Sequence, residues 1–378
     1  MAVLTEEQSM LRDAARTWTQ EKSPVTAFRK MRDSGAPLGY DPAAFAEMAE
    51  MGWTGVIIPE EYGGSNFGYL SLGLVLEETG RTLTASPLLA TGLAAASALI
   101  LGGSDAQKEA WLTKFAAGEA VGALAVDEGP HHAPEKVALE AKKSGSGYTL
   151  NGAKTFVIEG MAASVFVVSA RTSGKPGDKD GITLFLVPAD AKGVTRKQLK
   201  MADSRGYAAV TFAGVEVGAD AVLGTVDKGG ELLEKVLDRA RAGLAAEMLG
   251  SALQAFDVTL DYLKTRVQFG QVIGSFQALQ HRAAKMFTEL ELARSCVEAA
   301  LTAIDNDSPD VAELVSLAKA KVGDTLHLVS NEMVQMHGGI GMTDAHDAGF
   351  YLKRARAAEA AYGNQAYHRD RYARINGY

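Results

Sequence analysis

Two segments in the last third of this 378-residue chain carry side chains that could bind a phosphate-bearing ligand. In the first segment Arg266, Phe269 and Gln277 follow at short offsets, and we expect them within a long helical stretch. An Arg guanidinium makes bidentate contacts to a pyrophosphate, while Phe269 offers an apolar wall and Gln277 both donates and accepts hydrogen bonds. The alternative is structural: Arg266 would be a solvated helix charge and Phe269 a core residue.

The second segment reads Gln335-Met-His-Gly338-Gly339. The amide of Gln335 can bond a ligand, and the two glycines have no Cβ, so their backbone permits close approach by a cofactor. Gln335, Gly338 and Gly339 could therefore contact a cofactor.

Glu247 is the best-placed candidate for a catalytic base. Its neighbours in the sequence are apolar, which would raise the pKa of the carboxyl if the side chain is buried, and a base near neutrality suits proton abstraction. The neighbours are Ala245, Ala246, Met248 and Leu249. The alternative is a structural carboxylate that pairs with an Arg or fills a polar gap between helices.

His131 and His132 could suggest a metal site, but adjacent side chains point apart on a strand and no Cys or His follows at ligand spacing. We interpret them as loop residues, and we expect no metal. The basic, aromatic segment 367–374 could suggest nucleic acid, but the chain is acidic overall, with a net charge of −8. We expect a terminal helix that packs on a partner subunit instead, and neither nucleic acid nor a membrane as partner.

The single cysteine, Cys296, excludes an intrachain disulfide and favours the cytoplasm. The first residues lack the basic and apolar regions of a signal peptide, and the most apolar stretch, 88–101, is too short to span a bilayer.

The spacing of apolar residues predicts the helices and strands that must position these side chains. Residues 5–120 show helical spacing after a capping box at Thr5 and Gln8, and residues 228–378 show three long helical patterns that predict a bundle. Between them, short alternating runs separated by Gly and Asp predict a small β-barrel or sandwich. The runs are 137–140, 148–151, 165–170, 182–187 and 209–215. We predict an α+β multidomain chain with a helical domain at 1–120, a β domain at 121–225 and a helical bundle at 226–378.

The order of these domains and of several motifs resembles the acyl-CoA dehydrogenase family over nearly the whole chain. The motifs lie at 51–64, 148–154, 223–230 and 241–250, and in the two segments described above. The resemblance implies FAD as cofactor, with Arg266, Phe269, Gln277, Gln335, Gly338 and Gly339 lent to the FAD of a neighbouring subunit. It also implies α,β-desaturation of an acyl-CoA, with electrons passed to an electron-transfer flavoprotein.

The chain departs from the family where the flavin and the base belong. The family's Thr-Glu-Pro and Gly-Ser-Asp loop is replaced at 125–134, and Ile158 stands where the family has a hydroxyl facing the flavin. A buried flavin edge left without that hydrogen bond costs about 1–3 kcal/mol. The family's two alternative Glu positions hold Tyr362 and Ala240, and a phenol titrates near 10.

These departures resemble a degenerate subunit of a heterotetrameric, steroid-type acyl-CoA dehydrogenase. We expect the chain to complete a paralogous partner's FAD site in an α2β2 complex. Two alternatives remain open: a self-sufficient homotetrameric dehydrogenase that uses Glu247 as base, and a flavin-free structural or regulatory protein of the same fold.

Overall fold

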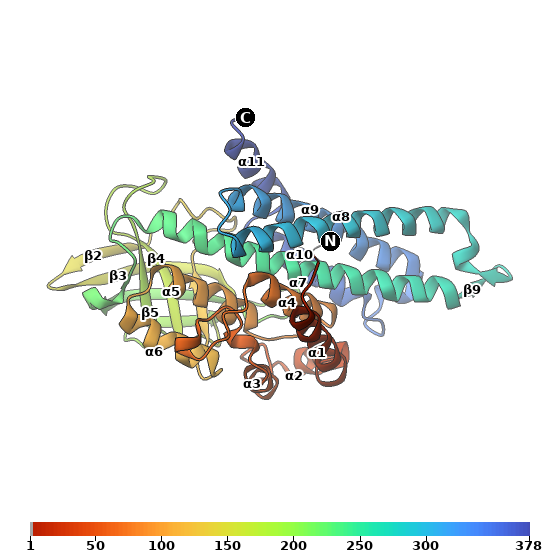
Figure 1. The fold of residues 1–378 in the computed structure, drawn as a ribbon, viewed down its shortest axis with the longest axis horizontal. Coiled ribbons are helices and arrows are strands. Elements are labelled where there is room, and N and C mark those ends of the chain that lie inside the picture. Colours follow the sequence, from red (N-terminus) through yellow and green to blue (C-terminus); the bar gives the residue numbers. More distant parts are fainter. Residues whose placement is uncertain (1–2) are drawn as a thin grey trace. The chain divides into compact units, whose positions relative to one another are not determined.

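The structure, a computed structural model, describes residues 3–378, so the first two residues of the predicted N-terminal domain lie outside it (Figure 1). The described chain forms two compact units. The first comprises residues 3–29, Gly73–Thr84 and Arg241–Tyr378, and the second comprises Lys30–Leu72 and Ala85–Ala240. No helix within 3–378 combines the length and apolarity needed to cross a bilayer.

Helices build the first unit. They are α1 (Glu6–Lys22), the start of α2 (Val25–Ser34), most of α4 (Tyr69–Arg81), α7 (Gly229–Thr265) from Arg241 onward, α8 (Gln277–Asp305), α9 (Val311–His337), α10 (Ala348–Ala360) and α11 (Gln365–Ile375). The predicted capping box is confirmed, because Thr5 Oγ1 accepts from the Gln8 backbone N–H at 3.2 Å and the Gln8 side chain accepts in return. The basic segment near the end of the chain is helical, as expected.

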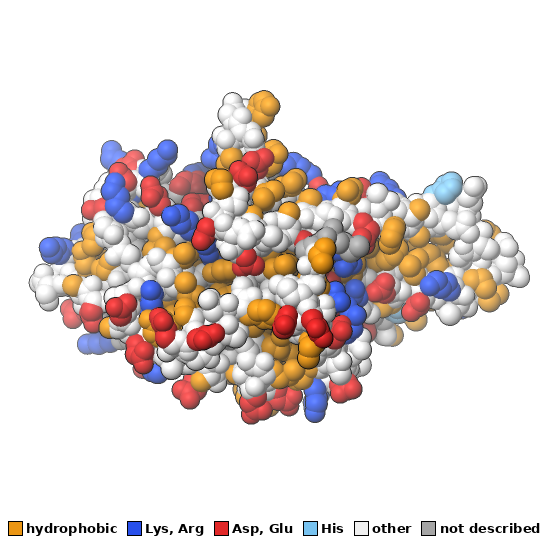
Figure 2. All heavy atoms as spheres, in the orientation of Figure 1, with side chains coloured by type: hydrophobic (Ala, Val, Ile, Leu, Met, Phe, Trp, Pro, Cys, Tyr) orange, Lys and Arg blue, Asp and Glu red, His pale blue; other side chains and the backbone are white. Residues whose placement is uncertain are grey.

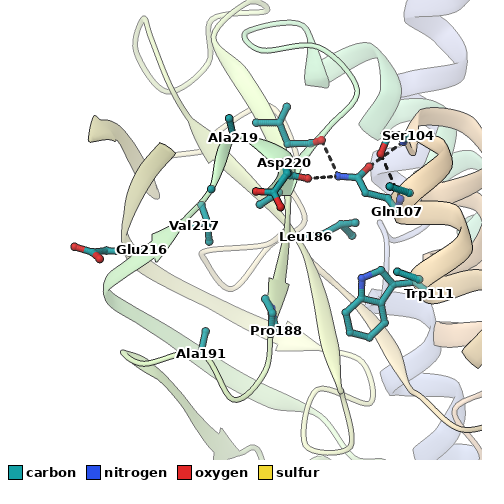
Figure 3. A pocket seen from close by; sticks show the side chains of 15 residues that line it. Ser104, Gln107, Trp111, Leu186, Pro188, Ala191, Glu216, Val217, Ala219 and Asp220 are labelled. Atoms are coloured by element: carbon teal, nitrogen blue, oxygen red, sulfur yellow. Dashed lines mark hydrogen bonds between the residues drawn. The ribbon is translucent and has the colours of Figure 1, made fainter. Parts of the chain in front are cut away.

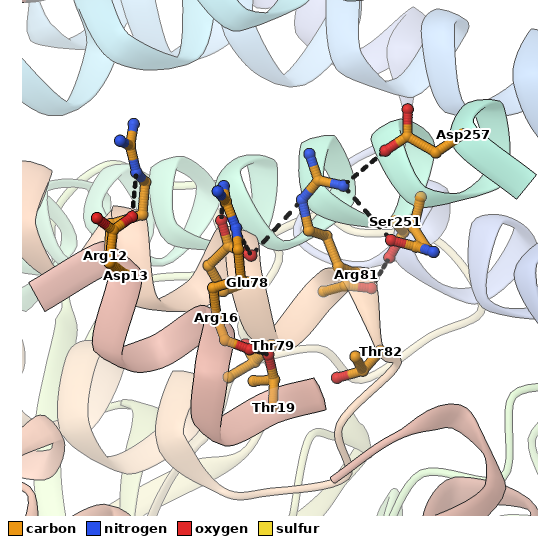
Figure 4. A network of polar contacts seen from close by, with 12 residues as sticks. Arg12, Asp13, Arg16, Thr19, Glu78, Thr79, Arg81, Thr82, Ser251 and Asp257 are labelled. Carbon is orange, nitrogen blue, oxygen red and sulfur yellow. Dashed lines mark hydrogen bonds and ion pairs between the residues drawn. The ribbon is translucent and has the colours of Figure 1, made fainter. Parts of the chain in front are cut away.

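Two helices of the first unit, α4 and α7, cross at glycines. A Cβ added at Gly250 would lie 1.8 Å from the carbonyl oxygen of Glu77, and one at Gly80 would lie 2.1 Å from that of Glu247. Polar contacts flank the crossing (Figure 4): Ser251 Oγ donates to the Gly80 carbonyl at 2.9 Å. The crossing therefore depends on residues without side chains, which let two helix backbones touch.

The second unit combines short helices with a sheet. Besides the remaining parts of α2, α4 and α7, its helices are α3 (Pro42–Glu50), α5 (Ala96–Gly102), α6 (Asp105–Ala116), a π-helical turn at Leu89–Ala95 and 3-10 turns at Trp53–Gly55, Glu60–Tyr62 and Ala219–Ala221. Its strands are β1 (Gly122–Ala125), β2 (Glu140–Ser144), β3 (Gly147–Val157), β4 (Val165–Arg171), β5 (Ile182–Pro188), β6 (Val194–Gln198), β7 (Ala208–Val217) and β8 (Val222–Leu223).

The strands follow the order β6-β7-β3-β2-β4-β5-β8, with β1 parallel to β4. Strands β2 and β4 meet at the single pair Glu140 and Arg171, so this junction divides the sheet into two halves. Phe166 of β4 contacts Phe212 of β7 edge-on, with ring centroids 6.3 Å apart, although these strands are not neighbours. The halves therefore face each other across a shared apolar core, in keeping with the predicted β domain.

Four of the five predicted strand runs are confirmed, but the run at 137–140 is wrong except for its last residue. The backbone N–H groups of Ala138 and Leu139 donate to the carboxylate of Glu128, at 3.0 and 2.9 Å, instead of joining a ladder. Strands β1, β6 and β8, and β2 beyond Glu140, lie outside the predicted runs, because they are short and β2 and β6 are largely exposed and polar.

Candidate functional site

The first predicted segment is not helical, which corrects the expectation from the sequence. Helix α7 ends at Thr265, and a tight hairpin of β9 (Val267–Gln268) and β10 (Gln271–Val272) follows, visible at the end of α7 in Figure 1. Phe269 and Gly270 form its turn with φ angles of +55° and +79°, values that a right-handed helix cannot contain. A 3-10 turn, η5 (Ile273–Ser275), then leads into α8.

The structure brings the two predicted segments together at one end of three helices. The ring of Tyr262, in the last turns of α7, stacks on His337 at the end of α9, with centroids 4.3 Å apart. Arg282, early in α8, pairs with Glu332 of α9 at 2.6 Å. We call the six residues at this end the cofactor strip; they are Arg266, Phe269, Gln277, Gln335, Gly338 and Gly339.

All six strip residues are exposed, and Phe269 is 92% exposed. Within residues 3–378, the side chains of Arg266, Gln277 and Gln335 make no hydrogen bond or ion pair. A Cβ at Gly338 or Gly339 would meet nothing within 4 Å, so their backbone is open. In Figure 2 the surface at this end is mainly apolar or uncharged, which suits contact with another molecule.

The strip also favours an anion. Helix α8 begins at Gln277, and its N-cap Phe276 provides no side-chain cap, so first-turn N–H groups keep unsatisfied hydrogen-bonding capacity. The carbonyl of Arg266 accepts from Ile273 N at 2.9 Å, which holds Arg266 beside the turn that enters α8. An exposed Arg on a segment bonded to the turn before an uncapped helix N-terminus suits a pyrophosphate, so these residue types fit the FAD that the resemblance implies.

Glu247, the predicted catalytic base, lies far from the cofactor strip. It is buried in α7, about 28 Å along the helix from Arg266 at 1.5 Å per residue. Its Oε1 accepts from Arg354 Nη1 of α10 at 3.2 Å, and both side chains are almost fully buried. The structure therefore gives Glu247 an Arg partner and does not bring it to the strip.

The turn that replaces the family's C-terminal Glu is surrounded by basic side chains. Tyr362 is buried with φ +55°, and its carbonyl accepts from Arg241 Nε at 3.2 Å and His368 Nε2 at 3.1 Å. Lys319 of α9 donates to three carbonyls at the end of α10 and beyond, those of Ala358, Glu359 and Gly363. Burial lowers the pKa of Lys319 to about 7, against the opposing effect of Glu359. Lys319 could not be identified from the sequence, because nothing in its helical spacing marks it as buried.

In the second unit, the segment that replaces the family's flavin loop has both of its carboxylates bonded to other groups of the same chain. Asp127 accepts from His132 Nδ1 at 3.0 Å, which explains one of the two adjacent histidines. Glu128 accepts from Lys154 Nζ at 2.7 Å as well as from the 138–139 backbone. Burial lowers the pKa of Lys154 to about 8, and Glu128 partly offsets this effect. Both loop carboxylates are thus engaged by their own chain.

Ile158, the residue in place of the family's hydroxyl, is buried and directly follows the end of β3. Phe156 precedes it with φ +52° and remains partly exposed. An aliphatic side chain at 158 offers no donor to a ligand.

A cavity of about 590 Å³ in the second unit contains none of the strip residues (Figure 3). Its central polar group, the Gln107 amide, already donates to the carbonyls of Asp220 and Val222 at 2.7 and 2.9 Å. The amide of Gln107 is therefore already engaged by its own chain.

Comparison with known proteins assigns the family. Residues 5–119, 128–216 and 227–376 match the N-terminal, middle and C-terminal domains of acyl-CoA dehydrogenase. The chain is 31% identical to the probable acyl-CoA dehydrogenase YngJ of Bacillus subtilis over 372 residues, covering 95% of each.

Among solved structures, butyryl-CoA dehydrogenase from Megasphaera elsdenii matches with a TM-score of 0.92 and 27% identity, over 100% of this chain and 99% of that one. A chain in a structure described as the electron transferring flavoprotein of Acidaminococcus fermentans matches with a TM-score of 0.91 and 29% identity, again over 100% and 99%. This chain belongs to the acyl-CoA dehydrogenase family, whose members are oxidoreductases that act on CH–CH bonds.

Proposed function

We propose that this chain is the subunit of an α2β2 acyl-CoA dehydrogenase that completes the FAD site of a paralogous partner. The observation that carries the proposal is the cofactor strip, whose polar side chains are exposed and unengaged by residues 3–378. A polar group that already has a partner loses that contact when it binds a ligand, whereas these groups lose only water. The strip is therefore suited to a ligand held mainly by another subunit.

In the proposed complex each strip residue has a binding role. Arg266 and the start of α8 hold the pyrophosphate, and Phe269 covers an apolar part of the cofactor. Gln277 and Gln335 bond polar edges, and the open backbone at Gly338 and Gly339 allows close approach. When bound, FAD supplies hydride acceptance from an acyl-CoA thioester.

The partner would supply the catalytic base and the rest of the flavin site. Three observations support this division: the inward-facing carboxylates of Asp127 and Glu128, the aliphatic side chain of Ile158 and the pairing of Glu247 with Arg354. The proposal includes a cytoplasmic complex of lipid or steroid catabolism whose electrons pass to an electron-transfer flavoprotein. The likeness to a chain from an electron transferring flavoprotein structure supports that last partner.

Flavin stoichiometry tests the proposal. The chain is purified alone and after co-expression with its paralogous subunit, and FAD is counted per chain by absorbance after denaturation. We expect almost no FAD on the chain alone and about one FAD per two chains in the complex.

The alternatives give different counts. One FAD per chain in the protein purified alone would favour the self-sufficient homotetramer. Absence of FAD in both preparations, with no complex formed, would favour the flavin-free structural or regulatory protein.

A further inference from the structure

Three aromatic rings form a stack next in the chain to residues of the cofactor strip, and each comes from a different segment. His337, the last residue of α9, lies between Tyr262 of α7 and His346 in the loop before α10. Its ring is stacked on Tyr262 with centroids 4.3 Å apart and 30° between planes, and it lies tilted against His346, also at 4.3 Å. We refer to Tyr262, His337 and His346 as the ring stack.

Both segments of the strip are connected directly to the ring stack, one through a backbone hydrogen bond and the other through a peptide bond. The carbonyl of Tyr262 accepts from Arg266 N at 2.9 Å, so the backbone of the ring-bearing residue holds the strip arginine. On the other side, His337 is bonded directly to Gly338, whose φ of +63° and ψ of −139° suit glycine. The contact between the rings of Tyr262 and His337 therefore joins the backbone that leads to Arg266 to the backbone that leads to Gly338.

The orientation of the central ring is set by hydrogen bonding. His337 Nδ1 lies 2.6 Å from the carbonyl of Met333, one turn earlier in α9, so Nδ1 carries the proton and donates. Nε2 is then an acceptor; it is buried and has no hydrogen-bond partner among the residues that the structure describes. Burial also lowers the pKa of His337, which keeps the ring neutral beside His346.

His346 is held in turn by the chain that follows it. Its Nδ1 accepts from Ala348 N at 3.1 Å at the start of α10, so both histidines have their rings fixed by backbone groups. A buried nitrogen without a partner costs stability, about 1–3 kcal/mol, so Nε2 of His337 does not stabilise the fold by hydrogen bonding. The stack is thus better explained by the placement of the rings than by the hydrogen bonds of His337 alone.

We propose that His337 is a positioning residue, which sets the spacing between Arg266 and the Gly338–Gly339 turn through the ring stack. This inference rests on the proposed function, because the strip is taken to bind the partner's FAD. It predicts that ring geometry at position 337 controls FAD affinity separately from overall stability.

The test compares His337→Leu, which removes the ring, with His337→Phe, which keeps a ring of similar size between Tyr262 and His346. Phe also replaces the unpartnered Nε2 by carbon, at the loss of one hydrogen bond to Met333. FAD affinity is measured in the complex purified with the paralogous subunit, by titration of the deflavinated complex. We expect His337→Leu to raise the dissociation constant about tenfold, the effect of losing one well-placed contact, and His337→Phe to restore most of it.

A matched control and a second measurement separate positioning from stability. His368→Leu removes another buried histidine of the first unit, whose Nε2 bonds the Tyr362 carbonyl away from the strip. We expect it to lower the melting temperature without changing FAD affinity. In the chain alone, hydrogen exchange should quicken at 262–273 and 335–342 in His337→Leu and not in His368→Leu.

The outcomes distinguish the inference from the proposed function. If Arg266→Ala weakens FAD binding but His337→Leu changes neither affinity nor exchange at the strip, the inference is wrong and the proposed function stands. If Arg266→Ala also leaves FAD binding unchanged, the strip does not bind FAD and both are overturned.

Discussion

Glu247 and Arg354, 107 residues apart in the sequence, form an ion pair inside the helical unit, with Oε1 and Nη1 3.2 Å apart. Only about one twentieth of Glu247 and even less of Arg354 is exposed, so solvent screens this pair little. A buried carboxylate paired in this way stabilises the guanidinium beside it, and removal of one charge leaves the other buried and uncompensated.

The first prediction concerns Glu247→Gln in the assembled complex. Loss of one partner of a buried pair destabilises a protein by roughly 3–5 kcal/mol, and Gln retains part of the hydrogen bonding, so we expect the lower end of that range. Turnover should change little at temperatures well below melting, measured by steady-state kinetics. As a control, Asp370→Asn breaks the exposed pair with Arg374 and should alter stability by less than about 1 kcal/mol. A loss of roughly 10²–10⁴-fold in kcat with unchanged melting and full FAD would instead identify Glu247 as the base.

The second prediction concerns Arg266→Ala. A charge-assisted contact to a pyrophosphate is worth roughly 1.5–3 kcal/mol, so the FAD dissociation constant of the complex should rise about tenfold or more. Lys264→Ala is the matched control, because Lys264 is an exposed base in the last turn of α7 and lies outside the strip. Equal FAD affinity in the two variants would contradict a specific contact by Arg266.

The third prediction concerns the crossing of α4 and α7. Gly250→Ala should destabilise the chain, because the new Cβ would lie 1.8 Å from the Glu77 carbonyl oxygen and force the two helices apart. Overpacking of this kind costs about 1–3 kcal/mol, more than the gain of about 1 kcal/mol in helix propensity.

Gly349→Ala in α10 is the control for this change, since no atom lies within 4 Å of the added Cβ. Gly349→Ala should raise the free energy of unfolding by up to about 1 kcal/mol. Changes of opposite sign for Gly250→Ala and Gly349→Ala in urea unfolding would support the close contact of α4 and α7. A neutral Gly250→Ala would show that the helices separate without penalty.

The fourth prediction concerns pH. The pKa of Lys319 is lowered to about 7 in the folded chain, while an unfolded Lys titrates near 10.4. Between these values the unfolded chain binds more protons, so the free energy of unfolding should rise with pH, by up to about 1.4 kcal/mol per pH unit. Below about pH 7 both states are protonated and the destabilisation by the buried charge is complete.

Lys319→Met should remove this part of the pH dependence. The measurement is the difference in unfolding free energy between wild type and Lys319→Met at pH 7, 8 and 9. As pH rises from 7 to 9, the free energy of unfolding of the wild type should increase relative to that of Lys319→Met. A difference that stays constant with pH would contradict a depressed pKa of Lys319.

The sequence determined the elements and the family resemblance. Helical periodicity located α7, α8 and α9 to within a few residues, and alternation located four of the eight strands of the β domain, β3, β4, β5 and β7. Both patterns are local, since each follows from which face of one element is buried. The strip residues could also be named from the sequence, because their spacing within two short segments matches the family.

Other features depended on the tertiary structure. The Arg266 segment proved to be a hairpin, because positive φ at Phe269 and Gly270 turns the chain where spacing alone favoured a helix. The partner of Glu247, the burial of Lys319 and the stacking of Tyr262 on His337 each join residues far apart in the chain. Side-chain periodicity does not encode such pairs, because it reports how much of one element is buried and not which element covers it.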